Sequence, residues 1–152
     1  MRLVKTTREL VLILTALLTF SCKENYVETV VTDKQIDISS EWKEVVPVHP
    51  LRCERRNQEI LLDLSTPHSA TIHPLGILLR DGKVARPEVQ LVGEDGTIHS
   101  LPDLSLLGDA VVLSSSVLPR SSNFSKVRIR SYESVQLSKV RFSCYNYEDV
   151  KR

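Results

Sequence analysis

Six basic side chains lie close together near the C-terminal end of the 152-residue chain: Arg120, Lys126, Arg128, Arg130, Lys139 and Arg141. Guanidinium groups beside aromatic rings can hold carboxylated or sulfated sugars, or lipid headgroups, through planar charge-assisted hydrogen bonds. If residues 124–130 pair with residues 139–147, then Arg128, Arg130 and Arg141 share one face with Tyr145. We take these four residues as a candidate ligand or partner face. The alternative is a solvated sheet face, balanced by acids such as the five in residues 88–109.

Trp42 is the one tryptophan of the chain. An exposed indole ring can stack on a sugar ring, so Trp42 joins the candidate ligand-binding residues. The alternative is a tryptophan at the edge of the core, which is the commoner environment of this residue.

The N-terminus has the three parts of a secretory signal. Arg2, Lys5 and Arg8 precede an apolar run, LVLILTALLTF, and the small residue Ser21 follows it. The run is too short for a transmembrane helix, which needs about 20 apolar residues. We therefore expect residues 1–21 to be a signal peptide and the mature chain to be exported.

The segment that ends in Ser21 and Cys22 resembles the lipobox of bacterial lipoproteins, although Thr19 and Phe20 depart from its usual pattern. The resemblance implies cleavage before Cys22, palmitate-type acylation of that residue and attachment to a membrane on the periplasmic or cell-surface side of the cell envelope. Several acyl chains give a durable anchor because each buried CH₂ contributes roughly 0.8 kcal/mol. A secreted protein and an uncleaved anchor are the alternatives.

Two cysteines, Cys53 and Cys144, remain for the mature domain. In an exported protein we expect them to form a disulfide. Closing a loop of about ninety residues contributes on the order of 4 kcal/mol through loop-closure entropy. Two buried free thiols are the alternative.

Motifs of catalytic and metal-binding sites are missing from the sequence. It holds no GxSxG, no HExxH and no phosphate-binding loop, and His68 and His73 are spaced for neither one helix face nor one strand face. We therefore expect no catalytic residue, metal or cofactor. The mature part is close to neutral, which argues against a nucleic-acid partner.

Short strands separated by turns fill the mature chain. In residues 124–130, Val127 and Ile129 alternate with basic residues, which is the period of a half-buried strand. In residues 139–147, Val140, Phe142 and Cys144 share one face, and a change of phase predicts a β-bulge near Ser138. We read residues 102–109 as a loop or a single helical turn.

These patterns predict an all-β fold with a single antiparallel, jelly-roll-like β-sandwich over residues 37–150. Residues 22–36 are expected to form a lipid-anchored tether, with a first strand near residues 27–31 left open. The closing segment FSKVRIRSYESVQLSKVRFSCYN resembles the last strands of galactose-binding-like (discoidin-like) jelly-roll domains. That resemblance implies a two-sheet sandwich, and many such domains bind glycans.

We therefore expect a membrane-anchored, non-enzymatic binding module of the cell envelope, for which a glycan is one candidate ligand and another envelope protein a candidate partner. Two alternatives remain open: a structural or interaction subunit of an envelope protein assembly, and a small hydrolase whose site motif reading does not detect.

Overall fold

The computed structural model describes residues 26–146, apart from residues 56, 66–69, 116–117 and 119–121. The signal peptide expected over residues 1–21 and the lipidation expected at Cys22 lie outside the described residues, as do Arg120 and His68.

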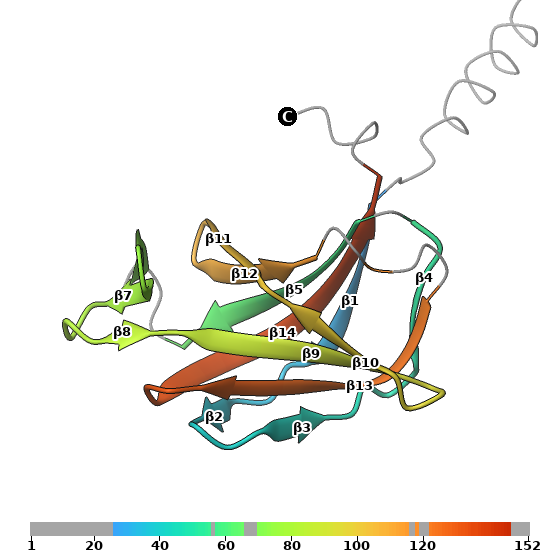
Figure 1. Cartoon of the computed structure of the whole chain (residues 1–152), viewed down its shortest axis with the longest axis horizontal. Coiled ribbons are helices and arrows are strands. Elements are labelled where there is room, and N and C mark those ends of the chain that lie inside the picture. The colour runs from blue at the N-terminus through green and yellow to red at the C-terminus, as the bar shows by residue number, and fades with distance from the viewer. Residues whose placement is uncertain (1–25, 56, 66–69, 116–117, 119–121, 147–152) are drawn as a thin grey trace, which may run out of the picture.

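Two antiparallel sheets face each other across one core, so the predicted all-β sandwich is confirmed (Figure 1). The first sheet has the order β1-β14-β5-β12-β11, with β2 also paired to β14. The second has the order β10-β9-β13-β3, with β4 also paired to β13. The strands of the first sheet are β1 (Tyr26–Thr32), β2 (Ile36–Ile38), β5 (Asn57–Leu64), β11 (Asp103–Leu107), β12 (Ala110–Ser114) and β14 (Val135–Tyr145). Those of the second are β3 (Lys43–Val45), β4 (Leu51–Cys53), β9 (Pro87–Gly93), β10 (Ile98–Leu101) and β13 (Ser122–Ser131).

Alternating side chains of both sheets build the core. Val127 and Ile129 of β13 are fully buried, and so are Val140 and Phe142 of β14. The rings of Phe124 and Phe142, one from each sheet, meet edge to face with 6.2 Å between their centroids. The period-two pattern in the sequence therefore identified the inward faces of the two closing strands.

The bulge predicted near Ser138 is confirmed. The pairing of β14 with β5 shifts register between Leu137 and Lys139. Because one extra residue reverses the direction of the following side chains, Leu137 and Val140 both point into the core.

The predicted disulfide is present between Cys53 and Cys144. Cys53 ends β4 in the second sheet, and Cys144 lies near the end of β14 in the first. Both residues are buried in the core. The bond therefore links the two sheets directly.

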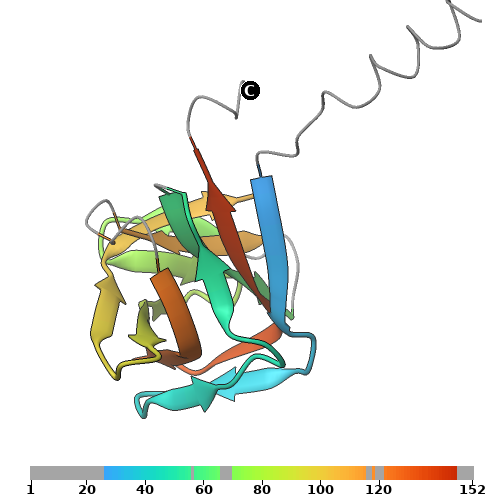
Figure 2. The same cartoon turned by 90° about the vertical axis from the view of Figure 1, so that its right-hand side faces the viewer.

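The folded domain begins earlier than position 37. The strand left open near residues 27–31 forms as β1, which pairs with β14 from Tyr26 opposite Tyr145 onward. Part of the segment expected as a tether over residues 22–36 is thus a strand, which extends the first sheet. Figure 2 shows the start of β1, in blue, beside the end of β14, in red.

The pairing of residues 124–130 with residues 139–147, which was the condition for a shared basic face, does not form. These segments form β13 and β14, which belong to different sheets. After Ser131 the chain crosses from one sheet to the other, and β14 begins at Val135. Val127 and Phe142 therefore both point into the core from opposite sides, while the basic residues of the two strands point outward in opposite directions.

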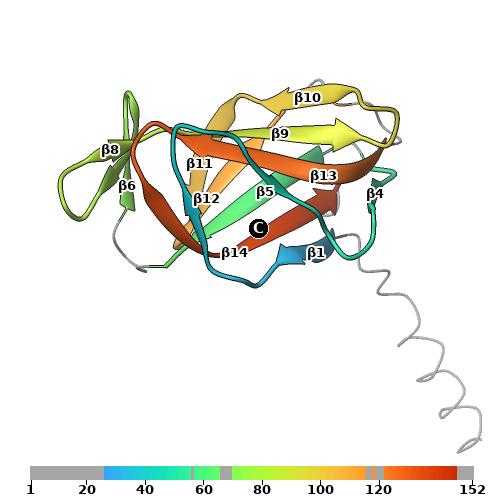
Figure 3. The same ribbon diagram turned by 90° about the horizontal axis from the view of Figure 1, so that it is seen from below.

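A third, three-stranded sheet lies at one end of the sandwich, far from the start of β1 (Figures 1 and 3). It consists of β6 (Ala70–His73), β7 (Gly76–Leu79) and β8 (Val84–Ala85), and the chain runs from β8 almost directly into β9. Asp81 and Gly82 lie in the predicted hairpin between β7 and β8, and Gly82 has φ +82°.

The reading of residues 102–109 as a loop or helical turn is wrong. Residues Asp103–Leu107 form β11, and Gly108 at φ +59° begins the two-residue turn into β12. A glycine followed by Asp109 between apolar runs is itself a hairpin signal, because such turns need a positive φ.

Candidate functional site

Trp42 lies just before β3, on the outer face of the second sheet, with its ring against two arginines of β13. The guanidinium carbon of Arg130 lies 4.5 Å from the ring centroid, and that of Arg128 lies 5.0 Å away. Each such cation–π contact contributes about 0.5–1 kcal/mol at an exposed site and more where water is excluded. The pair of contacts therefore holds the indole ring in one orientation.

The basic residues of β13 are paired with groups on the neighbouring strands. Lys126 Nζ lies 3.0 Å from Glu44 Oε2, and Arg128 Nη1 donates to Gln90 Oε1 at 3.1 Å. Arg130 Nε donates to Glu88 Oε2 at 2.7 Å. The register of the sheet places Glu88 directly opposite Arg130. Arg128 Nε also lies 3.7 Å from Glu44 Oε1, so all three cations have partners on the neighbouring strands.

Arg141 and Tyr145 lie on the outer face of the other sheet. Arg141 donates to both carboxylate oxygens of Asp63, at 2.7 and 2.6 Å, and to Glu28 at 3.1 Å. The hydrogen bonds with Asp63 are the main cause that raises the pKa of Arg141 above its usual value. Tyr145 is buried and donates its hydroxyl to Glu59. Arg141 and Tyr145 therefore share a face with each other but not with Arg128 and Arg130.

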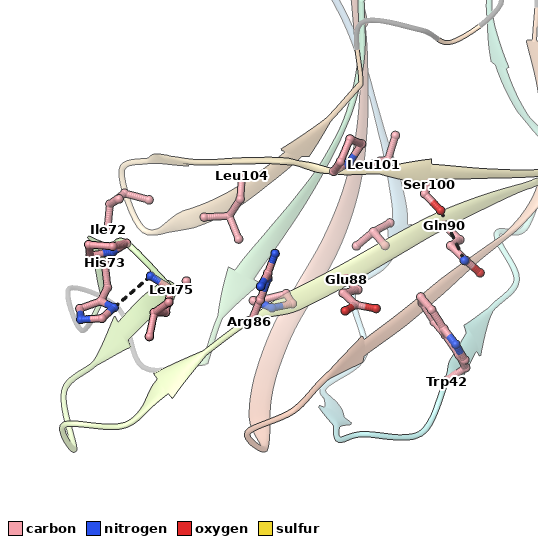
Figure 4. Close-up of a pocket in the computed structure, with 15 residues that line it drawn as sticks. Trp42, Ile72, His73, Leu75, Arg86, Glu88, Gln90, Ser100, Leu101 and Leu104 are labelled. Carbon is pink, nitrogen blue, oxygen red and sulfur yellow. Dashed lines mark hydrogen bonds between the residues drawn. The ribbon is translucent and has the colours of Figure 1, made fainter.

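A groove of about 450 Å³ opens beside Trp42 (Figure 4). We call it the Trp42 groove. Its floor is the start of β9, one wall is the turn between β6 and β7, and the passage from β10 to β11 closes another side. The lining residues are Trp42, Ile72, His73, Pro74, Leu75, Gly76, Arg86, Pro87, Glu88, Val89, Gln90, Ser100, Leu101, Pro102 and Leu104.

The polar groups of the Trp42 groove come mainly from one face of β9 and from Arg86, the residue just before this strand. Glu88 and Gln90 alternate with buried Val89 and Leu91, so both point to the outer face of the sheet. Arg130 Nε and Nη2 both contact Oε2 of Glu88. Among the described residues this leaves Oε1 of Glu88 without a hydrogen-bond partner. Glu88 is also the single carboxylate among the residues that line the groove.

Gln90 is oriented from two sides. Arg128 donates to its carbonyl oxygen, and its amide nitrogen donates to Ser100 Oγ at 3.4 Å. This pattern fixes the orientation of the amide and connects β13, β9 and β10. On the opposite wall, His73 Nδ1 accepts a hydrogen bond from the Leu75 backbone N–H at 3.1 Å. The proton of the neutral ring then sits on Nε2, where it can be donated to a ligand.

Apolar side chains form the wall opposite Trp42. Leu75 is 68% exposed and Ile72 is 55% exposed. The position of this wall depends on Gly76, where a Cβ atom would lie 2.4 Å from the backbone oxygen of Ala85. Glycine therefore permits the close approach of β7 to β8 that sets the β6–β7 turn beside the groove.

The described residues contain no cluster of three or more His, Cys, Asp or Glu side chains able to hold a metal ion. Over that part of the chain, no helix is long and apolar enough to cross a membrane.

Comparisons with protein-family models, with curated proteins and with solved structures find no match to this chain.

The sequence indicated Trp42, Arg128 and Arg130 but missed Glu88 and Gln90. A signal was available, because Glu88 and Gln90 alternate with Val89 and Leu91 and must therefore share a face. Alternation alone does not show that this face lies beside Trp42. Their proximity depends on β13, which pairs with β9 and whose arginines contact Trp42.

Proposed function

We propose that this protein is an exported, lipid-anchored, non-enzymatic binding module of the cell envelope, and that it binds a glycan in the Trp42 groove. The observation that carries the proposal is the indole ring of Trp42, held by Arg128 and Arg130 at the edge of a groove that also presents Glu88 and Gln90.

An aromatic ring beside fixed polar groups suits the surface of a sugar. The ring face of a pyranose is apolar and can stack on an indole, while its hydroxyl groups need directional donors and acceptors. Here Oε1 of Glu88 is an acceptor, and Ser100 and the Nε2 proton of His73 are polar groups within the same groove. Because Trp42 and Gln90 are both restrained by β13, little side-chain entropy is lost when a ligand binds.

The proposed anchor suits this placement of the groove. If Cys22 carries the lipid, the chain between Cys22 and Tyr26 spans at most about 14 Å, so the start of β1 stays near the bilayer. The groove is lined by residues of the β6–β7 turn, and the β6–β8 sheet lies at the end of the sandwich far from the start of β1 (Figures 1 and 3). The site would then face away from the membrane and toward extended polymers.

Intrinsic fluorescence gives a direct test, because Trp42 is the only tryptophan. The full-length protein in detergent is screened on a glycan array, and each positive oligosaccharide is then titrated while Trp42 emission is recorded. We expect a saturable change in emission with at least one glycan. Binding to no polysaccharide on the array would overturn the proposal.

Variants separate the groove from the rest of the surface. Trp42→Ala should abolish binding, and Trp42→Phe should retain part of it because a smaller ring still stacks. Tyr132→Ala is the matched control, since Tyr132 is exposed and also lies near Arg130 but is not among the lining residues. Binding by the Trp42→Ala protein, measured by calorimetry, at wild-type strength would place the glycan elsewhere.

A second candidate function is an interaction subunit of an envelope protein assembly. The observation in its favour is the exposure of Ile72 and Leu75 on the wall of the groove. In that case Ile72→Ser with Leu75→Ser should remove one defined envelope protein from the material that co-purifies with the full-length chain. Unchanged co-purification by this double variant would count against the assembly function.

A further inference from the structure

We infer that the glycan bound in the Trp42 groove carries a carboxylate, as in a uronic acid, and that Arg86 is the residue that binds it. This inference rests on the proposed function and names the ligand class of the same site.

Arg86 differs from the other cations near the groove because the described residues provide no partner for it. Lys126, Arg128 and Arg130 are each paired with Glu44, Gln90 or Glu88. Arg86 is exposed, lines the groove and makes no ion pair or hydrogen bond with the described residues through its side chain. The described part of the chain therefore uses none of the five donors of its guanidinium.

Among the charged residues that line the groove, Arg86 sets the preference for the charge of the ligand. Glu88 is the only lining carboxylate, and its charge is balanced by Arg130 at 2.5 Å from Oε2. Because Arg130 neutralises Glu88 from outside the lining, one positive charge, that of Arg86, is left uncompensated among the described residues of the groove. An anionic group is favoured there, and a planar carboxylate matches the guanidinium fork in a bidentate arrangement.

The distance of Arg86 from Trp42 indicates how many sugar units of the glycan contact the groove. Arg86, Glu88 and Gln90 follow one another at every second position, so they point to the same face about 7 Å apart. Figure 4 shows Trp42 on one side of Glu88 and Arg86 on the other. A ring stacked on Trp42 and a carboxylate held by Arg86 then belong to neighbouring sugar units, so the ligand is an oligosaccharide.

The test compares three oligosaccharide probes of equal length on the full-length protein in detergent: an oligouronide, its carboxyl-reduced neutral form and a sulfated neutral oligosaccharide. We expect the oligouronide to bind at least tenfold more tightly than the neutral form. The preference should shrink at high salt, because exposed charges are screened. Equal affinity for the oligouronide and the neutral form would overturn the inference, as would tighter binding of the sulfated probe.

Variants of Arg86 assign the effect to one side chain. Arg86→Gln should weaken oligouronide binding by about 10- to 100-fold, the size of a lost charged hydrogen-bonding partner, and should weaken binding of the neutral probe much less. Arg86→Lys should fall between the two, because lysine keeps the charge and loses the planar fork. Arg52→Gln, on the exposed face of β4 and outside the groove, is the matched control.

Failure of this inference differs from failure of the proposed function. If no probe and no array glycan binds, the proposed function itself is wrong. If the neutral glycan binds at Trp42 and Arg86→Gln changes nothing, the groove binds sugars and only the assignment of a carboxylate to Arg86 is overturned.

Discussion

The guanidinium of Arg130 lies over the Trp42 ring, 4.5 Å from its centroid, and the same group donates through Nε to Glu88 Oε2 at 2.7 Å. One arginine therefore positions both the aromatic ring and the carboxylate of the proposed site. Arg130 is a positioning residue here, because it acts on the groove through Trp42 and Glu88.

Replacing Arg130 should loosen Trp42 before it affects the fold. In Arg130→Gln the cation–π contact and the ion pair with Glu88 are both lost, so Trp42 should become more accessible to acrylamide quenching. Arg130→Lys should be intermediate. Arg52→Gln serves as the control for a lost surface cation. Quenching identical to the wild type in Arg130→Gln would contradict the positioning role.

Gly76→Ala should damage the wall of the groove. The added Cβ would lie 2.4 Å from the oxygen of Ala85, and the backbone at φ +151° disfavours any side chain. We expect a loss of about 1–3 kcal/mol in the free energy of unfolding, measured in urea. Gly82→Ala is the control, because φ there is +82° but nothing lies within 4 Å of the added atom. A smaller loss at Gly76 than at Gly82 would contradict the role of close strand approach.

Removing the Cys53–Cys144 disulfide should destabilise the domain strongly. The bond spans 91 residues and links β4 to β14 across the core. Cys53→Ala with Cys144→Ala should lower the free energy of unfolding by about 2–5 kcal/mol, measured by urea denaturation. Reducing agent should lower the melting temperature of the wild type and leave the double variant unchanged. Free thiols found by mass spectrometry in the native protein would contradict the bond.

The β9–β10 turn should respond to acid through Asp95. Its carboxylate accepts hydrogen bonds from Thr97, and the backbone N–H of Thr97, at 2.9 Å, is the main cause that lowers the pKa of Asp95. Because this pKa is lower in the folded protein, Asp95 stabilises the fold fully at a pH above its pKa in the unfolded chain, about 3.9. That stabilisation is lost as the pH falls through the pKa of Asp95 in the folded protein.

Asp95→Asn separates the charge from the turn geometry, because asparagine still accepts a hydrogen bond. We expect the stability advantage of the wild type over Asp95→Asn to vanish at strongly acid pH. An NMR titration of the Asp95 carboxyl group should show its midpoint below that of an exposed aspartate. A midpoint at or above the ordinary value would refute this assignment.

Cys22→Ser should abolish acylation and release the protein from the membrane fraction. The prediction follows from the lipobox-like segment that ends in Ser21 and Cys22. Metabolic palmitate labelling followed by membrane fractionation gives the measurement. Cys53→Ser is the control, because it removes a cysteine of the folded domain and should leave labelling intact. Unchanged labelling of Cys22→Ser would contradict the anchor.

Local alternation in the sequence was enough to predict the faces of strands. Val127 and Ile129, and likewise Val140 and Phe142, point inward as their spacing indicates, and the bulge near Ser138 follows from a break in that spacing. The disulfide could be predicted because the expected signal and anchor segment accounts for Cys22, which leaves only Cys53 and Cys144 for the domain. The strand faces and the bulge depend on residues that are close in the chain, and the disulfide had only one possible pairing.

The partners of each strand could not be predicted in the same way. Val127 and Phe142 show the same period whether their strands lie side by side or face each other across a core. The period therefore could not decide whether β13 pairs with β14, and the structure places them in different sheets. The candidate face was divided as a result, with Arg128 and Arg130 on one sheet and Arg141 on the other.

The sequence by itself determined the strand-rich fold, the inward faces, the disulfide pair and the expectation of export. The tertiary structure decided that Trp42 meets Arg130, that Glu88 lies opposite Arg130, and that Arg86 lines a groove without a partner among the described residues. The physical reason is that side-chain direction is set every second residue along a strand. Which strands become neighbours is set by packing of the whole core, through contacts between residues far apart in the chain.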